Sequence, residues 1–320
     1  MALIEVSKGV TAEPGFQTAI SVRNVLFATD FSSISEAALP YAAAVCRHFG
    51  STLHIAHIVS ETGLLMMAGG VDYVGLGTMY DAATSEAKEK IEDISQQLRG
   101  IPHCSYVRHG QVWLNLAEII AQNDIDLVVI GTHGRTGLGK LLLGSVAEDI
   151  LRRTARPVLT VGPRVSGRNK LPAFRNRQRD LAPAELELRH IVLATNFAAN
   201  ATQVAEAAGR LAQSFGAQLT LMHVIEDYET LGRRPGPIEN GAQRLRELIP
   251  ATLKLPYTPE TVLEFGSASE RILKVAEARE ADLIVLGARP AEAAGTARLP
   301  WSTANAVIAR AHCPVLTLRD

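Results

Sequence analysis

The sequence predicts an α/β protein made of two doubly wound domains in tandem. Three observations carry this prediction: an internal repeat, the alternation of short aliphatic runs with helical patterns, and the continuity of Val, Ile and Leu within those runs. Continuous apolar strands are typical of parallel sheets that are covered on both faces. Alternating strands and helices form right-handed βαβ units.

The repeat divides the chain into two related halves. Residues 23–59 match residues 189–225 without a gap, and the later pairs are 126–131 with 282–287 and 156–161 with 313–318. The second copy is ten residues shorter in its middle. We therefore expect one domain at 1–163, a linker at 164–186 and a second domain at 187–320. The linker contains Pro, Gly, Asn and six Lys or Arg residues and shows no sustained period, so a solvated connection is favoured over a basic interaction arm.

Each element of the first copy follows from its local pattern. Strands are expected at 25–29, 52–59, 104–110, 126–131 and 157–162, and helices at 35–50, 85–100, 114–124 and 145–155. The first helix has apolar residues three and four apart and ends at Gly50, a plausible C-terminal stop. Residues 64–81 show no such period, so we expect either a flap near a ligand or a loop packed on a neighbouring domain.

Composition limits the possible partners. The 320 residues are 47% hydrophobic, 20% charged and 5% aromatic, with a net charge of −1, so no overall field attracts nucleic acid or an anionic membrane. We see no secretory signal and no apolar run near the roughly 20 residues of a membrane helix, and we expect a cytoplasmic protein. Cys46, Cys104 and Cys313 form no CxxC pair and are predicted to be buried in a reducing compartment.

One stretch combines features of an anion site. After a predicted strand comes the sequence GTHGRTGLGKLLLGS, from Gly131 to Ser145. Gly131 and Gly134 let the backbone approach a ligand closely. Gly144 and Ser145 stand at the expected start of a helix, where free N–H groups and the helix dipole favour phosphate and where Ser145 could cap the helix. The spacing is neither a Walker loop nor the dinucleotide fingerprint, so by itself a structural turn is equally compatible.

Two further strand ends face the same edge of the expected sheet. Asp30 ends the first strand, where its carboxylate could bond a ribose hydroxyl or hold a divalent metal near phosphate; the alternative is an N-cap of the first helix. Ile58 ends the second strand and could offer its backbone to an adenine edge. His57 and His223 recur at one strand position, which favours a packing or backbone-bonding role.

Together these residues resemble the universal stress protein family in its tandem, ATP-binding form. The resemblance rests on ATDFS at 28–32, HIV at 57–59, G-x2-G-x9-G-S at 131–145 and PVLTV at 157–161. It implies a five-stranded Rossmann-like sheet of the adenine nucleotide alpha hydrolase-like kind in each domain. It also implies ATP with Mg²⁺ as ligand, with Thr29, Asp30 and Ile58 around the adenosine. The phosphates would lie against Gly131, Gly134, Gly144, Ser145 and Val146.

The second copy departs from this pattern. Asn196 replaces Asp30, and Trp301 falls where Gly144 lies, so we expect the second domain to keep the fold and to lose ordinary nucleotide binding. An alternative is a pocket altered to bind another ligand, with Asn196 and Arg289 as polar contacts.

The sequence offers no group to which we assign a catalytic role. The expected function is therefore a nucleotide-binding stress or signalling protein. The alternatives are a slow ATP hydrolase, a nucleotide-dependent transferase, or a scaffold, and the nucleotide could be ATP, AMP or a cyclic form.

The last strand of each copy is apolar enough to need covering. It runs PVLTV in the first copy and PVLTL in the second. Since this strand often mediates pairing in the family, the two domains are expected to pack as a pseudo-dimer. Two chains could then associate further as a homodimer.

Overall fold

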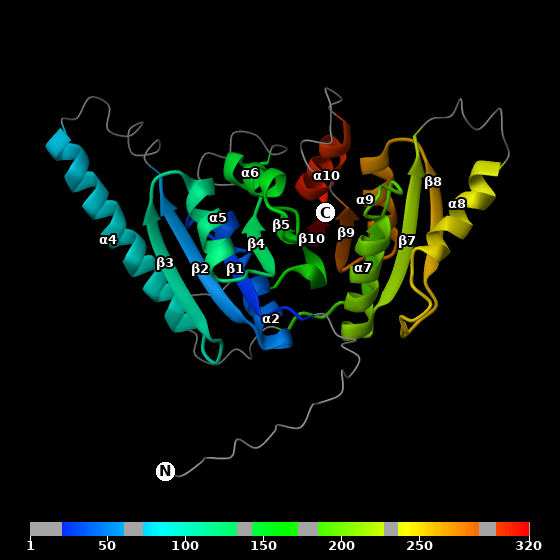
Figure 1. Ribbon diagram of the computed structural model, residues 1–320, viewed down its shortest axis with the longest axis horizontal. Helices are drawn as coiled ribbons and strands as arrows, with labels where there is room; N and C mark the ends of the chain where they lie inside the picture. The colour runs from blue at the N-terminus through cyan, green and yellow to red at the C-terminus, as the bar shows by residue number, and fades with distance from the viewer. Residues whose placement is uncertain are drawn as a thin grey trace, which may run out of the picture.

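The two halves share one ten-stranded sheet. The computed structural model describes residues 21–60, 73–132, 143–171, 185–226, 236–287 and 299–319. The strand order is β3-β2-β1-β4-β5-β10-β9-β6-β7-β8. All pairs within a half are parallel, and β5 pairs with β10 antiparallel. Figure 1 shows the halves side by side, with α4 and α8 at the outer ends and β5 and β10 between them.

The elements of the first half follow the predicted order. The strands are β1 Asn24–Ala28, β2 Thr52–Val59, β3 His103–His109, β4 Leu127–Gly131 and β5 Val158–Val161. The helices are α1 Ser33–Glu36, α2 Leu39–Phe49, α4 Tyr73–Gln97, α5 Val112–Gln122 and α6 Ser145–Arg153, followed by the short 3₁₀ helix η1 Gly167–Asn169. Gly50 ends α2 in the left-handed conformation, as predicted.

The second half repeats this order. Its strands are β6 His190–Ala194, β7 Gln218–Ile225, β8 Glu260–Phe265, β9 Leu283–Gly287 and β10 Val315–Leu318. Its helices are α7 Ala201–Phe215, α8 Gly236–Glu247, α9 Ala268–Ala278 and α10 Leu299–Arg310. The predicted fold class is therefore confirmed, with five parallel strands between helices in each half. None of the described helices has the length and apolarity to cross a membrane.

Both faces of the sheet are buried, which explains the continuous apolar strands. In β1, Val25 and Phe27 belong to one core cluster and Leu26 to the other. Helices α2, α4, α7 and α8 supply residues to the first cluster, and α5, α6, α9 and α10 supply the second. Since alternate strand residues point to opposite faces, a strand covered on both sides needs apolar side chains at every position.

Two aspartates tie the strands together at the amino-terminal edge. One carboxylate oxygen of Asp126 accepts hydrogen bonds from the backbone N–H groups of Arg23, at 2.7 Å, and Asn24, at 3.0 Å. Asp282 does the same for Arg189 and His190, at 2.7 and 2.9 Å. These bonds satisfy strand donors that enter the sheet before the ladder begins. The repeated DL pair of the sequence thus has a structural role in both halves.

Three expectations about the fold need correction, of which the first two concern residues 73–81 and Cys104 and the third concerns the linker. Residues 73–81 are helical, because α4 begins at Tyr73, so the predicted irregular segment is wrong there; 61–72 lie outside the described residues. Cys104 is exposed, because it lies on β3 at the edge of the sheet, whereas Cys46 and Cys313 are buried as predicted. Burial raises the pKa of both buried thiols to about 12.

The start of the linker is packed rather than solvated. Val165 is buried, and the side-chain amide of Asn169 donates to the carbonyl of Ala281 in the second half. The Tyr41 hydroxyl, on α2, donates to the carbonyl of Asn169 and accepts from the N–H of Leu171. Residues 167–171 therefore fasten the two halves together, which contradicts the expected solvated linker for this first part; residues 172–184 lie outside the described residues.

We expect Tyr41→Phe to lower the free energy of unfolding by about 1–2 kcal/mol, because it leaves a carbonyl and an N–H without their shared partner. Burial raises the pKa of the Tyr41 phenol to about 12, so the folded state favours the neutral donor. Its stabilising contribution should be complete below pH 10 and fall as the pH rises toward 12. Urea unfolding at pH 7.5 measures the loss, and an unchanged midpoint would contradict this role for Tyr41.

Candidate functional site

Seven of the eight predicted site residues lie around one cavity. It has a volume of about 250 Å³ at the carboxyl ends of β1, β2 and β4. The seven predicted residues are Thr29, Asp30, Ile58, Gly131, Gly144, Ser145 and Val146. The eighth, Gly134, lies outside the described residues. The structure therefore brings together residues that are more than 100 positions apart in sequence.

The glycine-rich loop returns to the point where it leaves the sheet. The N–H of Gly144 donates to the carbonyl of Thr132 at 2.8 Å, so the two ends of the loop are joined. Thr132 is fully buried and its own N–H donates to Val161 on β5. This closure explains why Gly131 and Gly144, thirteen positions apart, line the same cavity.

Helix α6 presents its amino terminus to this cavity. Gly144 is the N-cap, no side chain caps the helix, and the N–H of Glu148 makes the first intrahelical bond. The N–H groups of the first turn thus have no intrahelical acceptors, and the positive end of the helix dipole lies there. Ser145 is the first helical residue rather than a cap, which corrects the capping role considered for it.

Glycine is required at position 131 for a steric reason that the sequence did not reveal. A methyl group at its Cα would lie 2.6 Å from the carbonyl oxygen of Ile34 and 2.9 Å from the Cα of Ser35. Both atoms belong to the backbone of α1, which crosses directly over the end of β4. Gly131 is therefore required by helix packing, whatever the cavity binds.

The turn after β1 holds Asp30 beside the cavity. Its carboxylate accepts from the N–H of Ser32 at 3.0 Å, and Ser32 in turn is the N-cap of α1. Asp30 is thus not the cap that we considered as its alternative role. The Thr29 hydroxyl accepts from the N–H of Phe31 and from the hydroxyl of Ser35, at 3.0 and 2.7 Å, so its oxygen serves the turn.

The two repeated histidines support this turn in both halves. Nδ1 of His57 lies 2.8 Å from the carbonyl oxygen of Thr29, and Nδ1 of His223 lies 2.8 Å from that of Thr195. The ring of His57 also packs on Phe31, at 4.4 Å between centroids. Phe31 has a positive φ of 60°, which is uncommon without glycine. The backbone-bonding role predicted for both histidines is what the structure shows.

An apolar face of α5 forms another wall of the cavity. Val112 and Leu116, one helical turn apart on α5, line the cavity together with Ile58. Since α5 follows β3, its first turn must lie at the carboxyl edge of the sheet, and this connection could have indicated the wall. Apolar side chains there suit the flat faces of an aromatic ring.

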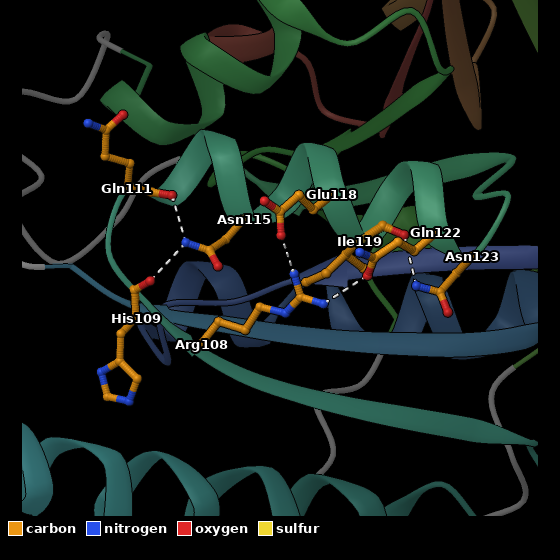
Figure 2. Close-up of polar contacts among 8 residues, drawn as sticks. All are labelled: Arg108, His109, Gln111, Asn115, Glu118, Ile119, Gln122 and Asn123. Carbon is orange, nitrogen blue, oxygen red and sulfur yellow. Dashed lines mark hydrogen bonds and ion pairs between the residues drawn. The ribbon is translucent and has the colours of Figure 1, made fainter.

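Polar contacts hold α5 in place against β3 (Figure 2). The side-chain amide of Asn115 donates to the carbonyls of His109 and Gln111, at 2.9 and 3.0 Å. Arg108 on β3 donates to Glu118 at 3.0 Å and to Gln122 at 3.1 Å. The Asn115 bonds hold the first turn of α5 and the Arg108 bonds hold its later turns, so the helix that carries the apolar wall is fixed along its length.

The second half lacks the same helix start. Trp301, the counterpart of Gly144, is the third residue of α10, which begins at Leu299. The free N–H groups of α10 are therefore displaced by three residues, or about 4.5 Å along the helix axis. Asn196 is exposed, and its side-chain oxygen accepts from the N–H of Ala198 at 3.1 Å, the same turn bond that Asp30 accepts from Ser32 in the first half. Arg289 and the counterpart of Gly134 lie outside the described residues.

Comparison with known families decides what this repeated architecture is. The sequence model of the universal stress protein family matches residues 21–162 and again residues 187–319. The chain belongs to the universal stress protein family. As a universal stress protein with two copies of the family domain, it carries the motif at 131–145 in the first copy and a changed version in the second.

Relatives of known sequence or structure agree. A universal stress protein from Methanocaldococcus jannaschii is 26% identical over 155 residues, covering 44% of this chain and 96% of the relative. A solved universal stress protein from Archaeoglobus fulgidus has a TM-score of 0.64 at 22% identity, covers 94% of this chain and 98% of its own, and so shares the fold. Another solved member, in complex with cAMP, covers 42% of this chain and 98% of its own, at 19% identity and a TM-score of 0.34.

Proposed function

We propose that this universal stress protein binds one ATP, in its first half, and acts as a nucleotide-binding stress or signalling protein. The observation that carries the proposal is the uncapped start of α6 opening onto the same cavity as Asp30 and the apolar wall of α5. Apolar side chains suit a base, a carboxylate suits ribose hydroxyls, and a helix amino terminus suits phosphate. Few other small molecules combine these three chemistries.

In this proposal each predicted residue has a distinct part. Ile58 and the turn residues Thr29 and Asp30 surround the adenosine, with Val112 and Leu116 against the base. Ser145 and Val146 offer backbone N–H groups to the phosphates, and Gly144 and Gly131 border the same space. Gly134, outside the described residues, keeps the place beside the phosphates that the resemblance implies. The 250 Å³ cavity suits a base and ribose, since pockets for larger ligands begin at about 300 Å³. The phosphates would then extend along the α6 terminus.

Asp30 can assist a Mg²⁺ ion that arrives with the nucleotide. Mg²⁺ commonly uses one or two carboxylates together with substrate phosphates, and Asp30 supplies one such carboxylate. Among the described residues, no group of three or more His, Cys, Asp or Glu side chains could hold a metal by itself. The metal ion would therefore owe most of its binding affinity to the phosphates of the nucleotide.

Binding without rapid turnover fits the residues at hand. Asp30 and His57 are the titratable side chains among the described residues that line the cavity, and His57 bonds the Thr29 carbonyl through Nδ1. Phosphoryl transfer would need a group that positions a nucleophile in line with the phosphate. We therefore propose that ATP acts by favouring one conformation or contact surface of the protein, which requires different affinities in two states.

The domain organisation is part of the same proposal. We place the two domains at 1–163 and 187–320, joined by the linker 164–186, and propose that they act as an intramolecular pseudo-dimer through β5 and β10. The backbone pairing of Val315 with Thr160 and of Thr317 with Val158 supports this arrangement. A shared sheet would also carry a change at the first site toward the second half.

Calorimetric titration with ATP and Mg²⁺ tests the function directly. We expect one ATP per full-length chain, and about tenfold weaker binding for Asp30→Asn, because a neutral amide bonds the ribose less strongly than a carboxylate. Asn196→Asp in the second half is the matched control and should not change affinity or stoichiometry. Two equivalents of ATP, or equal affinity of both variants, would contradict the proposal. AMP and cAMP titrated in parallel identify the preferred nucleotide.

A further inference from the structure

A closed network of hydrogen bonds surrounds the turn between α5 and β4. Its members are Asn24 on β1, His54 on β2, Tyr106 on β3, and Asn123 and Asp124 in the turn itself. His54 is the buried centre of this His54 network, with 5% of its surface exposed. Its Nδ1 lies 3.0 Å from the Tyr106 hydroxyl, and its Nε2 lies 3.3 Å from Oδ1 of Asn24. The histidine therefore links both sides of the network.

The bonds on the Tyr106 side have a fixed direction. The side-chain amide of Asn123 donates to the carbonyl of Ile119 at 2.9 Å (Figure 2), which leaves its oxygen as an acceptor. The Tyr106 hydroxyl donates to that oxygen at 2.9 Å. Since a hydroxyl has a single proton, the Tyr106 oxygen can bond His54 only by accepting from Nδ1. Nδ1 of His54 therefore carries a proton.

The contact on the Asn24 side needs a second proton on the same imidazole. The amide nitrogen of Asn24 donates to the carbonyl of Asp124 at 3.5 Å, so its oxygen faces Nε2 of His54. An amide oxygen can only accept, and the contact is therefore a hydrogen bond only when Nε2 is also protonated. A neutral imidazole has one N–H, whereas the imidazolium has two. The His54 network is complete only when His54 is positively charged.

A neutral His54 opens the network at its longest bond. Rotating the Asn24 amide by half a turn exchanges its oxygen and nitrogen, so that the nitrogen can donate to an unprotonated Nε2. That nitrogen then leaves the carbonyl of Asp124, to which its bond is 3.5 Å long. Asp124 has a positive φ of 44°, which is uncommon without glycine. The turn thus loses a contact at a strained position.

Burial opposes the charge that the complete network requires. It lowers the pKa of His54 from the ordinary value of 6.5, so the neutral form prevails at pH 7. Arg108 and Glu118 pair with each other at 3.0 Å, and the Asp126 carboxylate accepts two backbone N–H bonds. The ionisable groups on the elements around His54 are Cys104, Tyr106 and Arg108 on β3, Glu118 on α5, and Asp124 and Asp126 after α5.

We propose that His54 is a proton-dependent switch for the turn after α5. In mild acid Nε2 takes up a proton, the Asn24 amide presents its oxygen to it, and the amide nitrogen ties the carbonyl of Asp124 to β1. The second half has a different arrangement at the equivalent place. There Thr220 stands for His54, and Arg279, which stands for Asn123, donates to Glu260. This inference does not depend on the nucleotide proposal.

NMR titration of the nitrogen-15-labelled full-length chain tests the switch. Long-range proton–nitrogen spectra report the proton on each imidazole nitrogen, and His54→Gln identifies the His54 signals by their loss. At pH 7.5 we expect a proton on Nδ1 alone. Below pH 6.5 we expect proton uptake at Nε2, with a shift of the Asn24 side-chain amide signals at the same midpoint. A proton on Nε2 alone at pH 7.5, or no uptake down to pH 4.5, would overturn the proposal.

Removing one acceptor separates the network from a merely buried histidine. Tyr106→Phe and Asn24→Ala should each lower the proton affinity of His54 about tenfold, because each removes a hydrogen bond to the charged form. His103→Gln, at an exposed histidine on β3, is the control and should leave that affinity unchanged. Unchanged proton affinity of His54 in both acceptor variants would show that the network does not hold the proton.

Hydrogen exchange reports on the turn itself. The N–H of Ile125 donates to the carbonyl of Ile120 directly after the turn. Its protection factor should rise about tenfold as His54 takes up its proton, and it should stay constant in Asn24→Ala. A protection factor that does not change with pH in the natural sequence would overturn the link between His54 and the turn, and this measurement needs no variant to fold.

Discussion

Replacing Gly131 with alanine is expected to lower the free energy of unfolding by about 2–3 kcal/mol, near the upper end for overpacking one methyl group. The new carbon would lie 2.6 Å from the Ile34 carbonyl oxygen and 2.9 Å from the Ser35 Cα. Neither atom can swing away, because both are backbone atoms of α1. Relief requires that α1 move off the end of β4, and this also disturbs the Ser35 hydroxyl bond to Thr29.

The second half offers a matched control for this substitution. A methyl group at Gly287, the equivalent glycine, would lie 3.4 Å from Cγ2 of Val204 and 3.5 Å from Oδ1 of Asn200. These are ordinary side-chain contacts, so Gly287→Ala should cost less than about 1 kcal/mol. Urea unfolding followed by circular dichroism compares the two variants. Equal losses in both would show that α1 can shift freely and that Gly131 has no special steric role.

Gly144→Trp is expected to abolish ATP binding, with at least a hundredfold loss of affinity, while the protein stays folded. Gly144 has φ −64° and ψ 146°, an extended conformation open to any residue, and its N–H bond to Thr132 does not involve a side chain. The backbone can thus accept tryptophan. The indole, however, would stand at the uncapped start of α6, where we propose that the phosphates bind.

Gly144→Ala separates obstruction from a general effect at this position. Its methyl group is small, so ATP affinity should fall by less than about tenfold. Calorimetric titration gives the affinities, and thermal unfolding confirms that all variants are folded. Full ATP affinity in a folded Gly144→Trp protein would place the phosphates away from α6. The substitution also reproduces the residue found at the corresponding position of the second half, Trp301.

Much of the architecture was predictable from local pattern. The strand at 52–59 has the same limits in prediction and structure, and the left-handed cap at Gly50 follows from glycine at the end of an amphipathic helix. The start of helix α4 was predicted twelve residues too late, at 85 rather than 73, because its first turns contain glycines and no apolar period. The exposure of Cys104 depends on β3 being an edge strand, which pattern alone does not reveal.

The residues of the candidate site also fall into those that the sequence predicted and those that it did not. Its glycines, Asp30 and Ile58 were identified because they lie at the ends of predicted strands, in a recognisable motif. The structure places seven of the eight predicted residues around one cavity. The wall formed by Val112 and Leu116 was missed, because an apolar helix face has the same sequence signature whether it packs on protein or on a ligand. The true partner of Gly131 was missed for a related reason, since a close backbone approach leaves no mark in local sequence.

The sequence by itself determined the two-copy organisation, the parallel α/β class and the chemistry gathered at one edge of the first sheet. These features are encoded locally, in periodicity, in the ends of strands and in the comparison of one copy with the other. Only the tertiary structure decided how residues 167–171 fasten the halves and that a cavity lies between them. Those features depend on side chains that lie far apart in the chain, and their contacts exist only after the two halves have packed.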